Sequence, residues 1–233
     1  MSLNVIIPYL QIFNTIITVL LNLSPIVSFI SVIKGKEKYT NIPLLMLVFN
    51  LLNNLCWGCY WKRTGQNSAM ICSIICSIIA TIFVYIYFYY LVKKNIKKYI
   101  LYLFGLIFTE IVIIYISLYI IQNLNYYGRY LIVINIIMYI APGQNLIKVI
   151  KEKNYKLIPI SSTIVGAICS GGWYSFGKIV NDINCMIPNG LGFIFSILTT
   201  IIWVIYYFRA KIIRKKTKFY PELNNISQSV EVK

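Results

Sequence analysis

Seven apolar segments, each long enough to cross a lipid bilayer, constrain the fold of this chain more than any other feature. Their approximate bounds are 7–32, 42–61, 68–92, 99–121, 130–150, 157–179 and 187–208. The hydrocarbon core of a bilayer is about 30 Å thick, which about 20 helical residues span. Since 59% of the residues are apolar and only 12% are charged, too little polar surface remains for a soluble domain of this length. We therefore expect an all-α, multi-pass integral membrane protein with seven transmembrane helices.

Basic residues distinguish the two sides of the predicted bundle. The loops on one side carry seventeen Lys and Arg residues, whereas those on the other side carry four. By the positive-inside rule, the N-terminus is outside and the C-terminus is cytosolic. Residues 209–233 begin basic and end polar, which is typical of a disordered cytosolic tail. The net charge of +16 thus reflects membrane topology, and we expect the lipid bilayer and not nucleic acid as the partner.

We do not expect an enzyme, because the groups that catalysis commonly uses are missing from the sequence. The chain has no histidine, the commonest general base and metal ligand. Five of the six cysteines lie inside apolar segments, where they act as small hydrophobic residues. The sequence contains no nucleotide-binding loop, metal cluster or activated nucleophile, so we expect no catalytic residues, no metal and no other cofactor.

An internal repeat divides the chain. Pro43 and Trp57 are fourteen residues apart, and the same interval separates Pro159 from Trp173. Each copy covers three apolar segments and leaves one segment between them as a connector, so both copies start on the same side of the membrane. This pattern predicts two parallel three-helix bundles related by a pseudo-twofold axis along the membrane normal. The resulting units are the first repeat at 1–98, the connector helix at 99–121, the second repeat at 122–208 and the tail at 209–233.

Four prolines occupy matching places in the two copies. Pro25 and Pro43 in the first copy correspond to Pro142 and Pro159 in the second. Each proline removes an intrahelical hydrogen bond, which a membrane helix tolerates where neighbouring groups satisfy the freed carbonyl. Because all four lie in the inner half of the predicted bundle, we interpret them as hinges of an inner gate.

The second copy carries three motifs that are specific in combination, "APGQNLIKVIKEK", "GGWYSFG" and "IPNGLGFIF". Together with the repeat, they resemble the SWEET sugar transporters, a branch of the PQ-loop and MtN3 group. The resemblance extends from Leu23 to Phe208 and implies a uniporter that moves mono- or disaccharides by alternating access. We expect the plasma membrane as its location more than an internal membrane, and a homo-oligomer is compatible with the sequence.

The resemblance also implies a central sugar pocket. The family uses a tryptophan and an asparagine that correspond to Trp173 and Asn189. Trp57 is the repeat counterpart of Trp173, Asn53 matches a polar pocket position, and Ser73 stands where the family usually has a second asparagine. Sugars have apolar C–H faces and a rim of hydroxyls, which suit aromatic rings and side-chain amides or hydroxyls respectively. The alternative is that the tryptophans lie at the membrane interface and the amides join helices.

An outer gate is predicted one turn beyond the two tryptophans. Tyr60 and Phe176 each follow their tryptophan by three residues, and Asp182 matches a gate residue in the family. The alternative for Asp182 is a solvated loop carboxylate. The first copy also carries Trp61 where the family usually has glycine, which leaves the identity of the sugar open.

Glu110 interrupts the connector segment near its middle, where an ionisable group suggests a function. It suits proton coupling, as in a PQ-loop carrier of amino acids or other small solutes, or a neutral hydrogen bond to a neighbouring helix, which we favour. The PQ-loop alternative is weakened because Ile26, and not glutamine, follows Pro25. A seven-helix receptor is disfavoured because such receptors lack a three-helix repeat.

Overall fold

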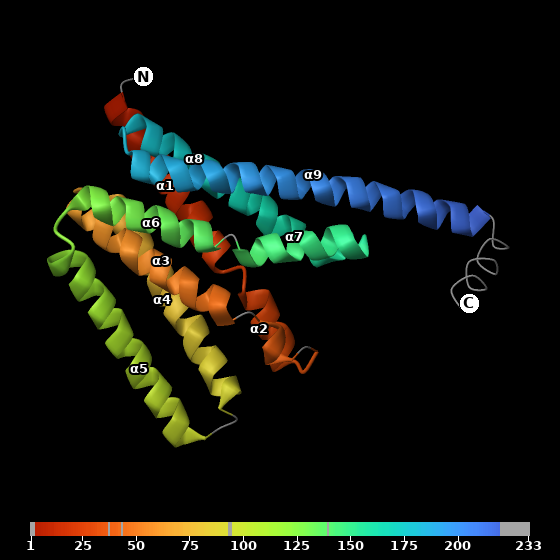
Figure 1. The fold of residues 1–233 in the computed structure, drawn as a ribbon, viewed down its shortest axis with the longest axis horizontal. Helices are drawn as coiled ribbons and strands as arrows, with labels where there is room; N and C mark the ends of the chain where they lie inside the picture. Colours follow the sequence, from red (N-terminus) through yellow and green to blue (C-terminus); the bar gives the residue numbers. More distant parts are fainter. Residues whose placement is uncertain (1–2, 37, 43, 93–94, 139, 220–233) are drawn as a thin grey trace.

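The computed structural model describes residues 3–36, 38–42, 44–92, 95–138 and 140–219 of the chain. Within these ranges every regular element is a helix, as the apolar segments predict. In Figure 1 the helices form a bundle from which α5 stands apart on one side, and α9 continues well beyond its neighbours.

The elements follow the apolar segments of the sequence closely. In chain order they are α1 (Leu3–Asn22), α2 (Ile26–Ile33), η1 (Tyr39–Asn41), α3 (Leu44–Arg63), α4 (Asn67–Leu91), α5 (Ile96–Tyr115), the π-helical turn η2 (Ile116–Ile120), α6 (Leu124–Met138), α7 (Ile140–Glu152), η3 (Tyr155–Leu157), α8 (Ile160–Ile179) and α9 (Ile183–Phe219).

Five helical stretches among the described residues are long and apolar enough to cross a membrane. They are Ile6–Ile33, Leu44–Arg63, Asn67–Leu91, Ile96–Ile120 and Ile183–Ile213. The two other predicted spans correspond to α6 together with α7, and to α8, whose Ser and Gly residues lower its hydropathy. The protein is thus a helical membrane protein, and the count of seven spans stays a prediction.

The two halves of the chain pack in the same way. In the first half α4 contacts both α1 and α3, and in the second half α9 contacts both α6 and α8. Between the halves, α1 packs against α8 and α3 packs against α6, while α5 lies against α3 and α4 (Figure 1). Each helix therefore makes the contacts that its counterpart in the other half makes.

Large apolar side chains cover the outside of the bundle. On α5, for example, Leu101, Phe104 and Phe108 are 67–69% exposed. A water-soluble protein rarely exposes so continuous an apolar surface, whereas lipid tails solvate it without cost. The exposed face of α5 is therefore consistent with contact to the bilayer.

Two of the four predicted hinge prolines lie at helix starts, where their missing N–H group is tolerated. The predicted span 7–32 is two helices, α1 and α2, and Pro25 is the residue that precedes α2. Pro159 stands in the same way before α8. Pro142 falls within α7, and Pro43 lies outside the described residues.

The prediction of a wholly disordered tail is wrong for its first part. α9 does not end near residue 208 but continues through Phe219. Residues 209–219 are rich in Lys and Arg, which are good helix formers, and contain no Gly or Pro, so that nothing in them ends a helix. The rest of the predicted tail, residues 220–233, lies outside the described residues.

Candidate functional site

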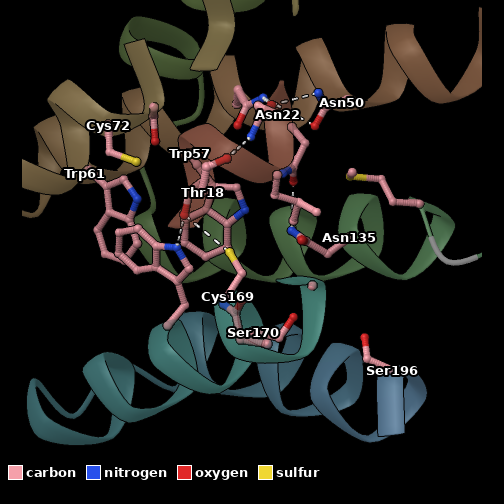
Figure 2. Close-up of a pocket in the computed structure, with 18 residues that line it drawn as sticks. Thr18, Asn22, Asn50, Trp57, Trp61, Cys72, Asn135, Cys169, Ser170 and Ser196 are labelled. Atoms are coloured by element: carbon pink, nitrogen blue, oxygen red, sulfur yellow. Dashed lines mark hydrogen bonds between the residues drawn. The ribbon is translucent and has the colours of Figure 1, made fainter. Parts of the chain in front are cut away.

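A cavity of about 220 Å³ lies where the two halves of the chain meet, and we call it the central cavity. Residues of α1, α3, α4, α6, α8 and α9 line it (Figure 2). All five residues predicted to bind the substrate are among them, namely Trp57, Trp173, Asn53, Ser73 and Asn189. The structure thus brings these side chains together, and their role as sugar ligands stays a prediction.

Asparagines that the sequence analysis did not single out complete the lining. They are Asn22, Asn50, Asn54 and Asn135. Three asparagines of α3, at positions 50, 53 and 54, have the spacing of one helix face, which is the signal that could have identified two of them. With Asn189, six side-chain amides surround the cavity. An amide both donates and accepts hydrogen bonds, which makes it suited to an uncharged ligand that carries hydroxyls.

One part of this lining is held together internally. The Oδ1 atom of Asn22 accepts hydrogen bonds from Nδ2 of Asn50 at 2.9 Å and from Nδ2 of Asn54 at 3.0 Å. Nδ2 of Asn22 in turn donates to the Thr18 carbonyl at 2.9 Å. These bonds join α1 to α3, and Figure 2 shows Asn22 beside Asn50. This wall is therefore fixed within the first half of the chain.

In another part of the lining, some side-chain polar atoms are available to a ligand. Nδ2 of Asn135 donates to Oδ1 of Asn53 at 2.9 Å, and Nδ2 of Asn189 donates to the Cys185 carbonyl at 2.8 Å. Within the described residues, Nδ2 of Asn53 and the Oδ1 atoms of Asn135 and Asn189 have no hydrogen-bond partner. The cavity thus offers one donor and two acceptors. Each belongs to an amide whose other polar atom already forms a hydrogen bond within the protein.

Three tryptophans close one end of the central cavity. The Trp57 and Trp61 rings stack with centroids 5.1 Å apart, and the Trp61 and Trp173 rings stack at 5.9 Å. Nε1 of Trp173 donates to Oγ1 of Thr18 on α1 at 2.8 Å, which fixes this ring across the two halves. Trp61 is only 3% exposed and belongs to the lining, although the sequence analysis noted it only as a departure from the family.

The helices α3 and α8 end beyond this stack, and we call this end of the bundle the outer end. The Tyr60 hydroxyl donates to Oδ1 of Asp182 at 3.0 Å and accepts from Nδ2 of Asn184 at 3.1 Å. Oδ1 of Asp182 also accepts from the backbone N–H groups of Asn184 and Cys185, which is the pattern of a helix N-cap. Asp182 therefore caps α9 and joins it to α3 through the same oxygen.

Phe176, the third residue of the predicted outer gate, is fully buried. Its ring meets Trp61 edge-on at 5.9 Å and Trp173 edge-on at 5.6 Å. Tyr60, Phe176 and Asp182 thus belong to one closely packed region that joins the two halves at the outer end.

The opposite end, which we call the inner end, contains a further cavity. A cavity of about 500 Å³ lies there between α1, α2, α3 and the start of α8, and Pro25 and Pro159 line it. Two of the four predicted hinge prolines therefore face the same open space. The outer end also contains a cavity, of about 360 Å³, which Tyr60, Asp182 and Asn184 help to line.

Glu110 does not reach the central cavity. It lines a separate cleft of about 460 Å³ between α3, α4 and α5, where its Oε1 accepts from Oγ1 of Thr81 at 2.9 Å. This neutral partner is the kind that the sequence analysis favoured over proton coupling. All six cysteines are buried and free of disulfide bonds.

This geometry defines a class of protein, namely a helical membrane protein with an amide-lined cavity between two similar halves. The family model described as "Sugar efflux transporter for intercellular exchange" matches residues 8–95 and 125–211 of the chain. The chain therefore belongs to this family, the SWEET or MtN3 transporters, and the family resemblance seen in the sequence is confirmed. Members of this family are transporters and not enzymes.

Individual relatives agree with the family match. The chain is 27% identical to the bidirectional sugar transporter SWEET7 of Arabidopsis thaliana, over 98% of this chain and 91% of that protein. It is also 27% identical to SWEET10 of the same plant, over 84% of this chain and 69% of the relative. A solved eukaryotic SWEET transporter has the same fold, with a TM-score of 0.76, 20% identity, and coverage of 88% of this chain and 98% of that chain.

Proposed function

We propose that the protein is a facilitative transporter that carries sugars through the membrane by alternating access. The observation that carries this proposal is the central cavity, which combines tryptophan rings with six amides at the contact between the two halves. The curated relatives, named as bidirectional sugar transporters, support sugar as the substrate.

The arrangement proposed for the chain is two parallel three-helix bundles joined by α5 as a connector. Support comes from the equivalent helix contacts of the two halves and from the two separate matches of the family model. The basic loops favour an N-terminus outside the cell and a cytosolic C-terminus, with the plasma membrane as the location.

In this proposal the amides distinguish a sugar from other solutes of similar size. Nδ2 of Asn53 donates to a sugar oxygen, while Oδ1 of Asn135 and of Asn189 accept from sugar hydroxyls. Ser73 contributes a hydroxyl from α4, and the rings of Trp57 and Trp173 provide an apolar surface for the C–H groups. No charged side chain lines the cavity among the described residues, which suits an uncharged substrate.

Alternating access requires the two ends of the bundle to open and close in turn. The bonds between Tyr60, Asp182 and Asn184 join the two halves at the outer end, and a cavity of about 500 Å³ lies at the inner end. Transport requires these bonds to break and the inner end to close. Pro25 separates α1 from α2, Pro159 precedes α8, and both line the inner cavity, so we assign the bending to these positions and to their counterparts Pro142 and Pro43.

Uniport is favoured over proton coupling because of the location of Glu110. Its carboxyl group lies in the cleft beside α5, where it accepts a hydrogen bond from Thr81, and not in the lining of the central cavity. A proton on Glu110 would therefore make no direct contact with a substrate between the two halves.

Uptake of radiolabelled glucose into a transporter-deficient cell tests the proposal. We expect saturable uptake that is independent of the proton gradient and is lost in Trp173→Ala and in Asn189→Ala. Trp203→Ala is the matched control, because Trp203 stacks on Tyr207 and does not line the central cavity. Absence of flux with glucose, fructose and sucrose would refute the proposal, and uptake that collapses with the proton gradient would replace uniport by coupled transport.

A further inference from the structure

Trp61 fills the space between the two tryptophans that are equivalent in the repeat. Its ring is nearly parallel to that of Trp57, at 26°, and to that of Trp173, at 19°. One face of each equivalent ring is therefore covered by protein and is closed to a ligand. A sugar in the central cavity has to lie beside this stack of three rings and not between Trp57 and Trp173.

The position of the Trp61 ring follows from helix geometry. Trp57 and Trp61 are four residues apart in α3 and so lie on the same face of the helix, one above the other, which brings their rings into contact. Phe176 meets Trp61 edge-on at 5.9 Å, and Tyr60 meets it edge-on at 5.3 Å. These neighbours prevent the ring from turning outward, so that Trp61 forms a fixed ceiling of the cavity.

Hydrogen bonds hold one wall below this ceiling in place. Asn22, Asn50 and Asn54 are joined by hydrogen bonds of 2.9 and 3.0 Å. The ceiling bounds the central cavity on its outer side, and a volume of about 220 Å³ suits one hexose better than a disaccharide.

We infer that Trp61 restricts this transporter to monosaccharides by occupying the volume that the second ring of a disaccharide would need. The inference rests on the proposed function and adds the size class of the substrate and the residue that sets it. A nearly planar indole and a sugar ring are similar in size, so its removal creates room for a second ring at the outer side of the cavity.

A test compares radiolabelled glucose and sucrose in cells that carry the wild type, Trp61→Leu or Trp61→Gly at equal membrane abundance. We expect the wild type to take up glucose and not sucrose, and both variants to raise the ratio of sucrose to glucose uptake by about tenfold or more. The ratio is the informative quantity, because a ring that acts only as a gate changes both uptake rates equally. Trp203→Leu, a tryptophan substitution outside the cavity, should leave the ratio unchanged.

The wild type alone supplies a second measurement that does not depend on the folding of any variant. Excess unlabelled sucrose should fail to inhibit glucose uptake, whereas excess fructose should inhibit it. Sucrose uptake or sucrose inhibition in the wild type, or an unchanged ratio in both variants, would overturn the inference and leave sugar transport intact. A wild type that moves neither sugar overturns the proposed function, and the inference with it.

Discussion

Removal of the Tyr60 hydroxyl is predicted to open the outer end without disturbing the rest of the fold. Tyr60→Phe deletes the bond to Oδ1 of Asp182 at 3.0 Å and the bond from Asn184 at 3.1 Å. The aromatic contacts of the ring with Trp57 and Trp61 remain. The carboxylate of Asp182 still caps α9, so the variant loses only the hydrogen bonds that join Tyr60 of α3 to the start of α9.

The magnitude follows from the type of bond that is lost. A hydrogen bond to a charged group contributes about 1.5–3 kcal/mol after the competition of water is included. The bond exists only while the outer end is closed, so its whole contribution shifts the equilibrium between the two states. The ratio of outward-open to outward-closed molecules should therefore rise roughly 10- to 150-fold.

Spin labels at the ends of α3 and α8 measure this ratio directly. Lys62→Cys and Lys178→Cys place labels on exposed positions of the two halves, and the six native cysteines are buried. Tyr60→Phe should increase the population of long distances, whereas Tyr119→Phe, at an exposed tyrosine, should not. An identical distance distribution in Tyr60→Phe and the parent would refute the assignment of Tyr60 as an outer gate.

Three further predictions concern stability and coupling. Both amide atoms of Asn14 are buried without a hydrogen-bond partner among the described residues, so Asn14→Leu should raise the thermal unfolding temperature by removing a cost of about 1–3 kcal/mol; a lower temperature would contradict this. Gly172→Ala brings its new methyl group against Oδ1 of Asn14 and should destabilise the protein in the same assay, unless Asn14→Ala is present as well. Glu110→Gln keeps an acceptor for Thr81 and should preserve sugar uptake. If the variant instead loses an uptake that the proton gradient drives in the wild type, Glu110 has a coupling role.

The parts of the site that repeat along the chain could be predicted from the sequence. Trp57 and Trp173 are found because each follows a proline by fourteen residues, and they line one cavity because the two copies pack in the same way. The family resemblance supplies Asn53 and Asn189 as pocket positions, and Ser73 follows Trp57 by the sixteen residues that separate Asn189 from Trp173. The hydrophobic pattern likewise predicts helices, because an apolar run of this length has no other stable form in lipid.

The remaining features depend on contacts between distant residues. Asn135 bonds to Asn53 across 82 positions of the chain, and no local pattern marks such a pair. The sequence places Trp61 one turn after Trp57, but only the packing of α3 against α8 puts its ring between two others. The basic composition of residues 209–219 suggests a disordered tail. Lys and Arg are nevertheless good helix formers, and α9 continues through Phe219.

Sugar counterflow in liposomes is the most direct test of the central claim. Purified protein is reconstituted into vesicles loaded with unlabelled glucose, and radiolabelled glucose is added outside without an ion gradient. The account predicts that label accumulates transiently inside, because a carrier that alternates between two sides exchanges one sugar for another. It also predicts that Trp173→Ala abolishes the accumulation, whereas Trp203→Ala preserves it. Flux that requires a proton gradient, or counterflow that survives in Trp173→Ala, would contradict the account.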